Sequence, residues 1–219
     1  MRRTVGGERG AVTLRSILFL SALALVMLAV PAEAGAQKLE EYDYENLGLK
    51  AIGADIVWVN AKDAKGAVGF GFRADLGFLG PYVRVVPRFA HWKSDIEDQS
   101  VARFEQNLEE LCTPPGCTIE LGELKRDYWI VGLDFQWTLP SVMVAPYLGA
   151  GADLYVLDDS GQAIKGTFLD DAVVTAGLSA VAGLQANVAT HLRLRADIRG
   201  TLVTSASNVA IYAGLDYVF

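Results

Sequence analysis

Two histidines are the residues of this 219-residue chain best suited to acid–base chemistry near neutral pH. His91 is followed by Ser94 three residues later, and several carboxylates come next. In an extended segment alternate side chains share a face, so this spacing places His91 and Ser94 on opposite faces. His191 stands beside a predicted tight turn. The pattern therefore does not predict a catalytic site, and we expect no enzyme activity and no cofactor or metal site.

Twelve other charged residues show a pattern typical of ion pairs in an enclosed space. Each lies at a polar position of a segment in which polar and apolar residues alternate. Six acids balance six bases, so they can neutralise one another, as charges shielded from water must. The predicted lumen charge network consists of Asp55, Arg73, Asp75, Arg84, Arg88, Asp134, Asp153, Arg193, Arg195, Asp197, Arg199 and Asp216.

Eight segments of alternating polarity carry these residues and predict eight β-strands. Short turns between them alternate with longer connections, as in an antiparallel up-and-down barrel. We therefore expect an all-β fold, an eight-stranded antiparallel transmembrane barrel. The predicted segments are Leu49–Val59, Ala67–Leu79, Tyr82–Lys93, Arg126–Leu139, Met143–Leu157, Val173–Ala186, His191–Leu202 and Asn208–Phe219.

The alternation alone fits two architectures, a soluble barrel with an apolar interior and a membrane barrel with an apolar exterior. The polar phase favours the membrane barrel because it contains Gly, Tyr, Asp and Arg, whereas a water-facing sheet typically carries Lys, Glu and Thr. Aromatic residues in the apolar phase also fall into two bands, as interfacial girdles do. The bands are Trp58, Phe70, Phe89 and Trp129 toward the long connections, and Phe78, Trp137, Tyr217 and Phe219 toward the short turns.

The first 36 residues predict an export signal. Four arginines precede the apolar run Ile17–Val30, and small residues follow at the spacing of a cleavage site after Ala34 or Ala36. We expect a signal peptide over residues 1–36, a periplasmic lead-in over 37–46 and the barrel over 47–219. The net charge of −7 argues against a nucleic-acid partner bound through a basic surface.

The longest connection, Ser94–Lys125, is acidic and predicts a short amphipathic helix. The apolar residues at helical spacing are Val101, Phe104, Leu108 and Leu111. Cys112 and Cys117 follow, and in an oxidising compartment they predict a disulfide at the end of the helix. Two interpretations remain open: a recognition element on the cell surface, or a solvated cap over the barrel mouth.

The chain resembles the small outer-membrane β-barrel proteins of Gram-negative bacteria, the OmpA/OmpX/OmpW-like group. The export signal, the eight segments, the stretch Pro146–Ala152 and the terminal Phe219 carry the resemblance. It implies localisation in the outer membrane and contact with outer-membrane lipid and lipopolysaccharide. It also implies that Leu215, Tyr217 and Phe219 form a signal for the outer-membrane assembly machinery.

The resemblance leaves the function open because small barrels of this kind perform several roles. We expect a non-enzymatic, monomeric integral protein for envelope integrity or surface interaction, with the Asp/Arg network plugging its lumen. One alternative is an OmpW-like conduit for small apolar molecules, with an opening in the wall at Pro87. The other is a lipid A hydrolase using His91, although the closer His-x-Ser spacing of such enzymes is missing.

Overall fold

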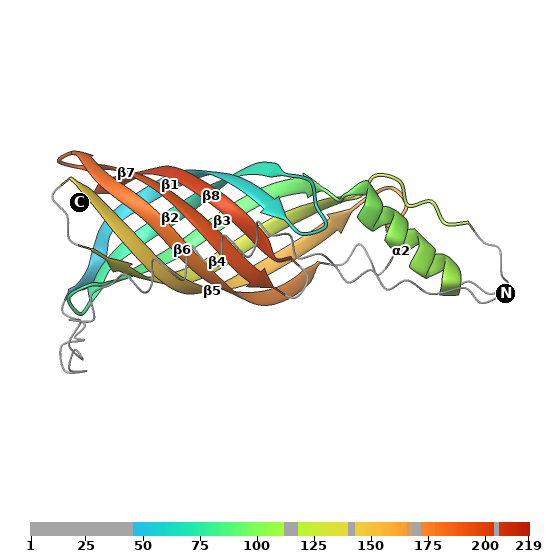
Figure 1. Ribbon diagram of the computed structural model, residues 1–219, viewed down its shortest axis with the longest axis horizontal. Coiled ribbons are helices and arrows are strands. Elements are labelled where there is room, and N and C mark those ends of the chain that lie inside the picture. The colour runs from blue at the N-terminus through green and yellow to red at the C-terminus, as the bar shows by residue number, and fades with distance from the viewer. Residues whose placement is uncertain (1–45, 112–117, 140–142, 166, 168–171, 204–205) are drawn as a thin grey trace, which may run out of the picture. The chain divides into compact units, whose positions relative to one another are not determined.

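Eight β-strands and one helix are present in the part of the chain that the structure describes (Figure 1). The structure, a computed structural model, describes residues 46–111, 118–139, 143–165, 167, 172–203 and 206–219. The strands are β1 Leu47–Ala61, β2 Ala67–Leu79, β3 Val83–Asp95, β4 Lys125–Thr138, β5 Val144–Ser160, β6 Val173–Ala189, β7 Leu192–Val203 and β8 Asn208–Val218. The helix, α2, spans Asp98–Leu111.

The strands form a closed barrel in which each strand pairs with its neighbours in chain order. All pairs are antiparallel, and β1 closes the barrel by pairing with β8. The predicted fold class is confirmed. Several strands extend up to three residues beyond their predicted ends, because the ladder continues through polar pairs such as Asp95 with Lys125, where the apolar alternation has stopped.

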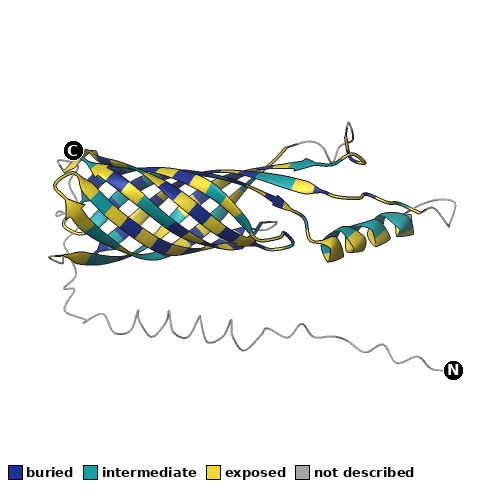
Figure 2. Ribbon diagram, turned by 90° about the horizontal axis from the view of Figure 1, so that it is seen from above, coloured by how far each residue is buried: buried dark blue, intermediate teal, exposed yellow. Residues whose placement is uncertain are grey.

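Alternate residues along every strand face the inside and the outside of the barrel, which gives the chequered burial of Figure 2. On β4, Trp129, Val131 and Leu133 are exposed on the outer wall, whereas Tyr128 and Asp134 are fully buried inside. An apolar exterior around a charged interior is the arrangement that a bilayer requires.

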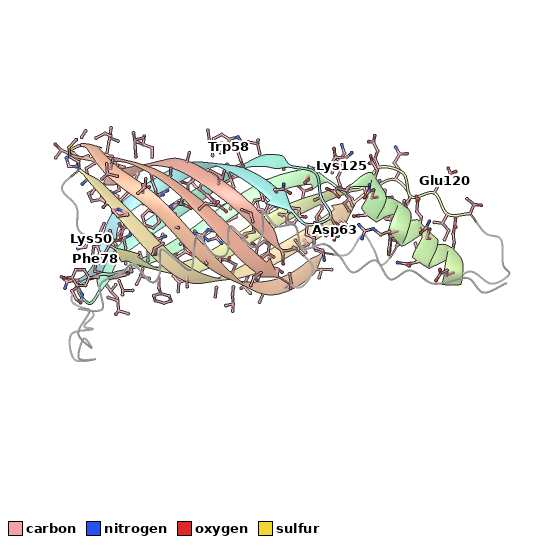
Figure 3. The ribbon with its side chains drawn as sticks, in the orientation of Figure 1. Lys50, Trp58, Asp63, Phe78, Glu120 and Lys125 are labelled. Carbon is pink, nitrogen blue, oxygen red and sulfur yellow. The ribbon has the colours of Figure 1, made fainter. Side chains whose placement is uncertain are left out.

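The two ends of the barrel differ. The connections β2–β3, β4–β5 and β6–β7 are short and meet at what we term the short-turn end, where Lys50 and Phe78 lie (Figure 3). The other connections meet at the long-loop end, near Asp63 and Lys125. Because strands run alternately up and down, the beginning of β1 and the end of β8 both lie at the short-turn end.

The helix α2 lies beyond the long-loop end and has a small apolar core of its own (Figure 1). Its residues Val101, Phe104 and Leu108 pack against buried Leu121, Leu124 and Ile164. Thus the predicted helix forms, with the predicted apolar face turned toward the returning chain. In the part of the chain that the structure describes, no helix has both the length and the apolar character needed to cross a membrane.

Candidate functional site

The inner wall of the barrel brings together all six aspartates and six arginines that the sequence places in the lumen. Each has an oppositely charged partner within 3.3 Å. Eleven of the twelve are buried, and Arg193 is partly buried. Because an unpaired charge away from water is very costly, this pairing is what allows so many charges to fill a narrow barrel.

The first cluster surrounds Arg195 on β7. Its Nη1 lies 2.5 Å from Asp216 Oδ1 and its Nη2 lies 2.6 Å from Asp55 Oδ1, so one guanidinium bridges two carboxylates. Arg73 Nε donates to Asp55 Oδ2 at 3.0 Å, and its Nη2 donates to Asp197 at 3.1 Å. The cluster therefore joins β1, β2, β7 and β8 across the lumen.

The second cluster surrounds Arg88 on β3. Its Nη2 lies 2.6 Å from Asp153 Oδ1, and its Nε lies 3.6 Å from Asp134 Oδ1. Arg199 forms a two-pronged pair with Asp134, with distances of 2.8 and 2.5 Å, and also donates to Ser179 Oγ at 3.0 Å. Such bidentate pairs are stronger and more directional than single contacts.

Both clusters are built on the same cross-strand unit, a Gly-x-Asp tripeptide facing a second Gly-x-Asp on the next strand. In each unit the glycine is the register partner of the aspartate on the facing strand. A Cβ on Gly132 would lie 2.1 Å from Asp153 Oδ1, so only glycine leaves room for that carboxylate. The units are Gly53–Asp55 with Gly214–Asp216, and Gly132–Asp134 with Gly151–Asp153.

The bridging arginines occupy equivalent positions. Arg195 is the register partner of Gly214, and Arg88 is the register partner of Gly132. Strands β3, β4 and β5 thus repeat the arrangement of β7, β8 and β1, whereas β6 has Ser179 where β2 has Arg73. The sequence interpretation missed this repeat, although the tripeptides Gly-Ala-Asp and Gly-Leu-Asp, each present twice, were an available signal.

A third group lies in the lumen toward the short-turn end. Asp75 Oδ2 lies 3.3 Å from Arg84 Nη1 and 3.0 Å from Arg193 Nη1. Arg84 also donates to Gln185 and Gln136, both at 2.7 Å. The cavity bordered by this group has a volume of about 10 Å³, which is about the room that one water molecule needs.

Toward the long-loop end the lumen is filled by apolar and aromatic side chains, which we term the apolar layer. One packed cluster crosses the barrel from β1 to β5, and the rings of Trp92 and Tyr128 stack within it at 5.3 Å. Its members are Val57, Val59, Ala61, Ala64, Ala90, Trp92, Tyr128, Ile130, Tyr155, Leu157, Val203, Ala206, Ala210 and Tyr212.

The apolar layer was not predicted, because the sequence interpretation filled the lumen with Gly, Tyr, Asp and Arg alone. A signal was nevertheless present. Near the long-loop end both phases of the alternation are apolar, as in Ile56–Val59 and Trp129–Val131. A strand that is apolar on both faces is buried on one side by protein and on the other by protein or lipid.

His91 and Ser94 do not meet. The His91 ring stacks on Trp129 with centroids 4.0 Å apart, and its Nδ1 lies 3.2 Å from the carbonyl oxygen of Tyr128. Ser94 is buried and donates its hydroxyl to the Lys65 carbonyl. His191 stacks on Tyr217 near the short-turn end.

The wall between β2 and β3 contains an irregularity at Pro87. The register shifts between Arg73 and Phe78, and Gly77 there has φ of 83°. The amide of Gly77 donates to Asp75 Oδ1 at 3.0 Å. Outside this segment lies a hollow of about 700 Å³ bordered by Pro87 and by the rings of neighbouring strands.

The connection between β1 and β2 holds α2 in place. Asp63 accepts hydrogen bonds from Ser100 Oγ at 3.1 Å and from Arg103 Nη2 at 3.4 Å, and its carbonyl accepts from the amide of Glu97. Asp63 has φ of 62°, a left-handed conformation that aspartate tolerates better than most residues. A hydrogen bond from Lys65 to Asp98 adds a second contact and raises the pKa of Lys65.

The residues at the end of β8 face outward. Leu215, Tyr217 and Phe219 are exposed, and the last two rings meet edge to face at 5.5 Å. The amide of Phe219 donates to the carbonyl of Lys50 on β1 at 2.9 Å. The C-terminal residue is thus attached to the strand that closes the barrel.

Other predictions fall on residues outside the described ranges. These are the signal peptide over 1–36, all but the last residue of the lead-in over 37–46, and the disulfide between Cys112 and Cys117. Within the described ranges, no group of three or more His, Cys, Asp and Glu side chains is placed to hold a metal ion.

Comparison with known proteins agrees with this architecture. The family model described as "Outer membrane protein beta-barrel domain" matches residues 20–219. A search of curated protein sequences finds no match.

Several solved structures are similar to the chain. Neisserial surface protein A has 17% sequence identity and a TM-score of 0.53, over 77% of this chain and 96% of that one. Ail, the attachment invasion locus protein of Yersinia pestis, has 17% identity and a TM-score of 0.48, over 80% and 99%. OprG from Pseudomonas aeruginosa has 11% identity and a TM-score of 0.46, over 80% and 97%. At this level of identity, the similarity to Neisserial surface protein A indicates the fold alone.

Proposed function

The chain belongs to the outer-membrane protein β-barrel family, and on this premise we propose that it is a non-enzymatic integral outer-membrane protein with a closed lumen. Its role is envelope integrity or interaction at the cell surface. It carries out that role through its wall and its long-loop end, and no solute passes through the interior.

The observation that carries this proposal is the pair of seals that lie in series along the lumen. The Asp/Arg network fills the barrel from the short-turn end to its middle, and the apolar layer fills it toward the long-loop end. An ion would have to disrupt paired charges and then cross a packed apolar layer. Either barrier alone would oppose conduction.

Conductance of the purified protein in planar bilayers tests the proposal. We expect no steady current from the unmodified chain, nor from Trp92→Ala or Arg195→Ala alone, because each single change leaves the other seal in place. The double variant should conduct. Trp129→Ala, which removes the neighbouring outward-facing indole, is the matched control and should stay silent. Steady current through the unmodified protein would overturn the closed lumen.

The long-loop end is the part of the molecule suited to contact with the surroundings of the cell. There α2 is held by Asp63 and by its own small core, so its orientation is defined and not averaged over a free loop. Outer-membrane lipid and lipopolysaccharide are the partners we propose for the wall, and the assembly machinery for biogenesis. Replacing residues 97–123 by a short Gly/Ser turn separates the two roles: a surface function should be lost, whereas envelope integrity should be retained.

A conduit for small apolar molecules is the second candidate, and the irregular wall at Pro87 favours it. The broken β2–β3 register and the adjoining outer hollow lie on the same strands. Saturable binding of a radiolabelled fatty acid by the purified protein, with uptake into vesicles that is lost when the β2–β3 pair is cross-linked, would favour the conduit over the closed barrel.

The non-enzymatic part of the proposal rests on His91 and Ser94, which face opposite sides of β3. Hydrolysis of lipid A by the purified protein that disappears in His91→Ala would favour the enzyme instead.

A further inference from the structure

Two parts of the lumen charge network border the same small cavity. One part is the third group, in which Asp75 contacts Arg84 and Arg193. The other is the first cluster, in which Arg195 contacts Asp216. Residues of both parts line the cavity of about 10 Å³. Among the hydrogen bonds and ion pairs of the described residues, none joins the third group to the first cluster. What the cavity holds therefore decides whether the two parts are connected there.

The cavity is buried, polar and of a size for one small molecule. Its charged lining residues have at most 8% of their surfaces exposed. They are Arg73, Asp75, Arg84, Arg195 and Asp216, and they come from β2, β3, β7 and β8. A volume of about 10 Å³ leaves room for one water-sized molecule and for no larger ligand. The site therefore takes a single molecule that is surrounded by charged groups.

Two of the arginines that line the cavity have a donor to spare. The Nε atoms of Arg84 and Arg195 are buried and have no hydrogen-bond partner among the described residues. Arg195 Nε lies 3.7 Å from Asp197 Oδ2, which is too far for a hydrogen bond. Arg88 and Arg199 also have an Nε without a partner, but neither residue lines the cavity. Because a buried N–H without a partner is costly, the two donors beside the cavity point to a bound acceptor.

The charges around the cavity select the occupant. An anion would meet the carboxylates of Asp75 and Asp216, and a cation would meet the guanidinium groups of Arg73, Arg84 and Arg195. A neutral molecule that both accepts and donates hydrogen bonds suits both kinds of group. We propose that one water molecule is bound in this cavity and joins the third group to the first cluster. It accepts hydrogen bonds from Nε of Arg84 and of Arg195. It donates its own hydrogens to Asp75 and Asp216, which gives four bonds, within the range for buried water.

The bound water connects four strands across the lumen. Asp75 and Arg84 come from β2 and β3, and Arg195 and Asp216 come from β7 and β8. This inference rests on the proposed closed lumen, since water that moves freely through an open pore would not remain at one site. It adds to that proposal how much water this part of the interior contains, which is one molecule held by four hydrogen bonds.

NMR of the ¹⁵N-labelled protein, refolded in detergent micelles, tests the site through its arginine Nε–H groups. In a rotating-frame experiment, a cross-peak to water that arises from direct contact has the opposite sign to one that arises from proton exchange. We expect contact cross-peaks at Nε–H of Arg84 and Arg195. None should appear at Arg199, the matched control, whose buried Nε also has no partner but which does not line the cavity.

A cavity-filling variant provides the second measurement. Val86 lines the cavity, so Val86→Ile should displace the water and abolish the cross-peaks at Arg84 and Arg195. Val59→Ile, the same change in the apolar layer, should retain them. Gel migration of unheated samples, relative to heated ones, checks that both variants are folded.

The outcomes separate this inference from the closed lumen. If the unmodified protein shows no contact cross-peaks at Arg84 and Arg195, or if they persist in folded Val86→Ile, the bound water is wrong, whereas silent bilayers would still support the closed lumen. Contact cross-peaks at Arg199 as well would mean that water fills the lumen, which would overturn both.

Discussion

At the scale of single residues, the lumen depends on charges that are paired and largely buried. Arg195 contacts two carboxylates, Asp55 and Asp216, and its side chain is only 2% exposed. Arg195 is important because, without it, these two acids would lie close together in a site of low dielectric constant. Each glycine of the Gly-x-Asp units has the complementary role, because its missing side chain provides the space that the facing carboxylate occupies.

Replacement of Arg195 by alanine should therefore be among the most destabilising single changes in the barrel. We expect Arg195→Ala to lower the free energy of unfolding by about 3–5 kcal/mol, the cost of leaving a buried charge unpaired. Urea unfolding of protein refolded in vesicles measures this. Arg103→Ala, which removes an exposed arginine from α2, is the control and should cost about 0–1 kcal/mol. Similar losses for both variants would mean that the lumen charges are hydrated.

Replacement of a glycine by alanine, which adds one methyl group, should affect stability differently at crowded and at open positions. We expect Gly132→Ala to destabilise by about 1–3 kcal/mol, because its Cβ would lie 2.1 Å from Asp153 Oδ1 and 3.0 Å from Arg88 Nε. Gly200→Ala, with no heavy atom within 4 Å of the added Cβ, should be neutral or slightly stabilising in detergent. If the two variants unfold at the same urea concentration, the close Gly–Asp packing does not contribute to stability.

At the scale of elements, the strands and the helix are stabilised in different ways. The strands close into a barrel in which every strand is paired on both sides, so no free edge strand remains. The helix α2 has only a small core and a few hydrogen bonds, to Asp63 and to the amides of Ile119 and Leu121. Its position therefore depends on the loop between β1 and β2 as well as on the returning chain.

Removal of the Asp63 carboxylate should loosen α2 and leave the barrel intact. In Asp63→Ala we expect amide hydrogens of α2 to exchange about fivefold faster, the change that a hydrogen bond worth about 1 kcal/mol produces. Mass spectrometry of exchanged peptides measures this, with peptides from β4 as the internal reference. Glu120→Ala, an exposed acid in the same connection, should leave exchange unchanged. Faster exchange throughout β4 in Asp63→Ala would contradict a local role for Asp63.

At the scale of the whole molecule, the barrel is a closed wall around an interior of paired charges and apolar side chains, and Phe219 lies where the wall closes. Phe219 is exposed on the outer wall while its amide donates to β1 through the Lys50 carbonyl. The ring contributes little to packing inside the barrel, which leaves it accessible to whatever inserts the chain into the membrane.

Deletion of Phe219 should thus impair assembly more than stability. We expect the amount of folded protein in the outer membrane to fall several-fold, whereas the chain refolded in detergent loses only the small contribution of an exposed ring, about 1 kcal/mol or less. Quantitative blotting of membrane fractions and urea unfolding measure the two quantities. Phe78→Ala at the same end of the barrel is the matched control. Equal losses in both assays would make Phe219 an ordinary packing residue.

The sequence by itself determined the elements of this protein and the side of the wall on which each residue lies. A period of two is a local property, because adjacent side chains of a strand point in opposite directions whatever the rest of the chain does. The eight strands, the outward Leu133 and the inward Arg195 could all be predicted in this way. The helix followed from an equally local period.

Only the tertiary structure decided which residues meet across the lumen. Arg73 pairs with Asp197 from β2 to β7, and Arg199 pairs with Asp134 from β7 to β4, although no local pattern links these positions. Such contacts depend on the height at which strands face each other, and the register and tilt of the closed barrel set that height. The apolar layer arises for the same reason. Its members are inward-facing apolar residues of separate strands, and they form one packed cluster only because closure of the barrel brings them to the same level.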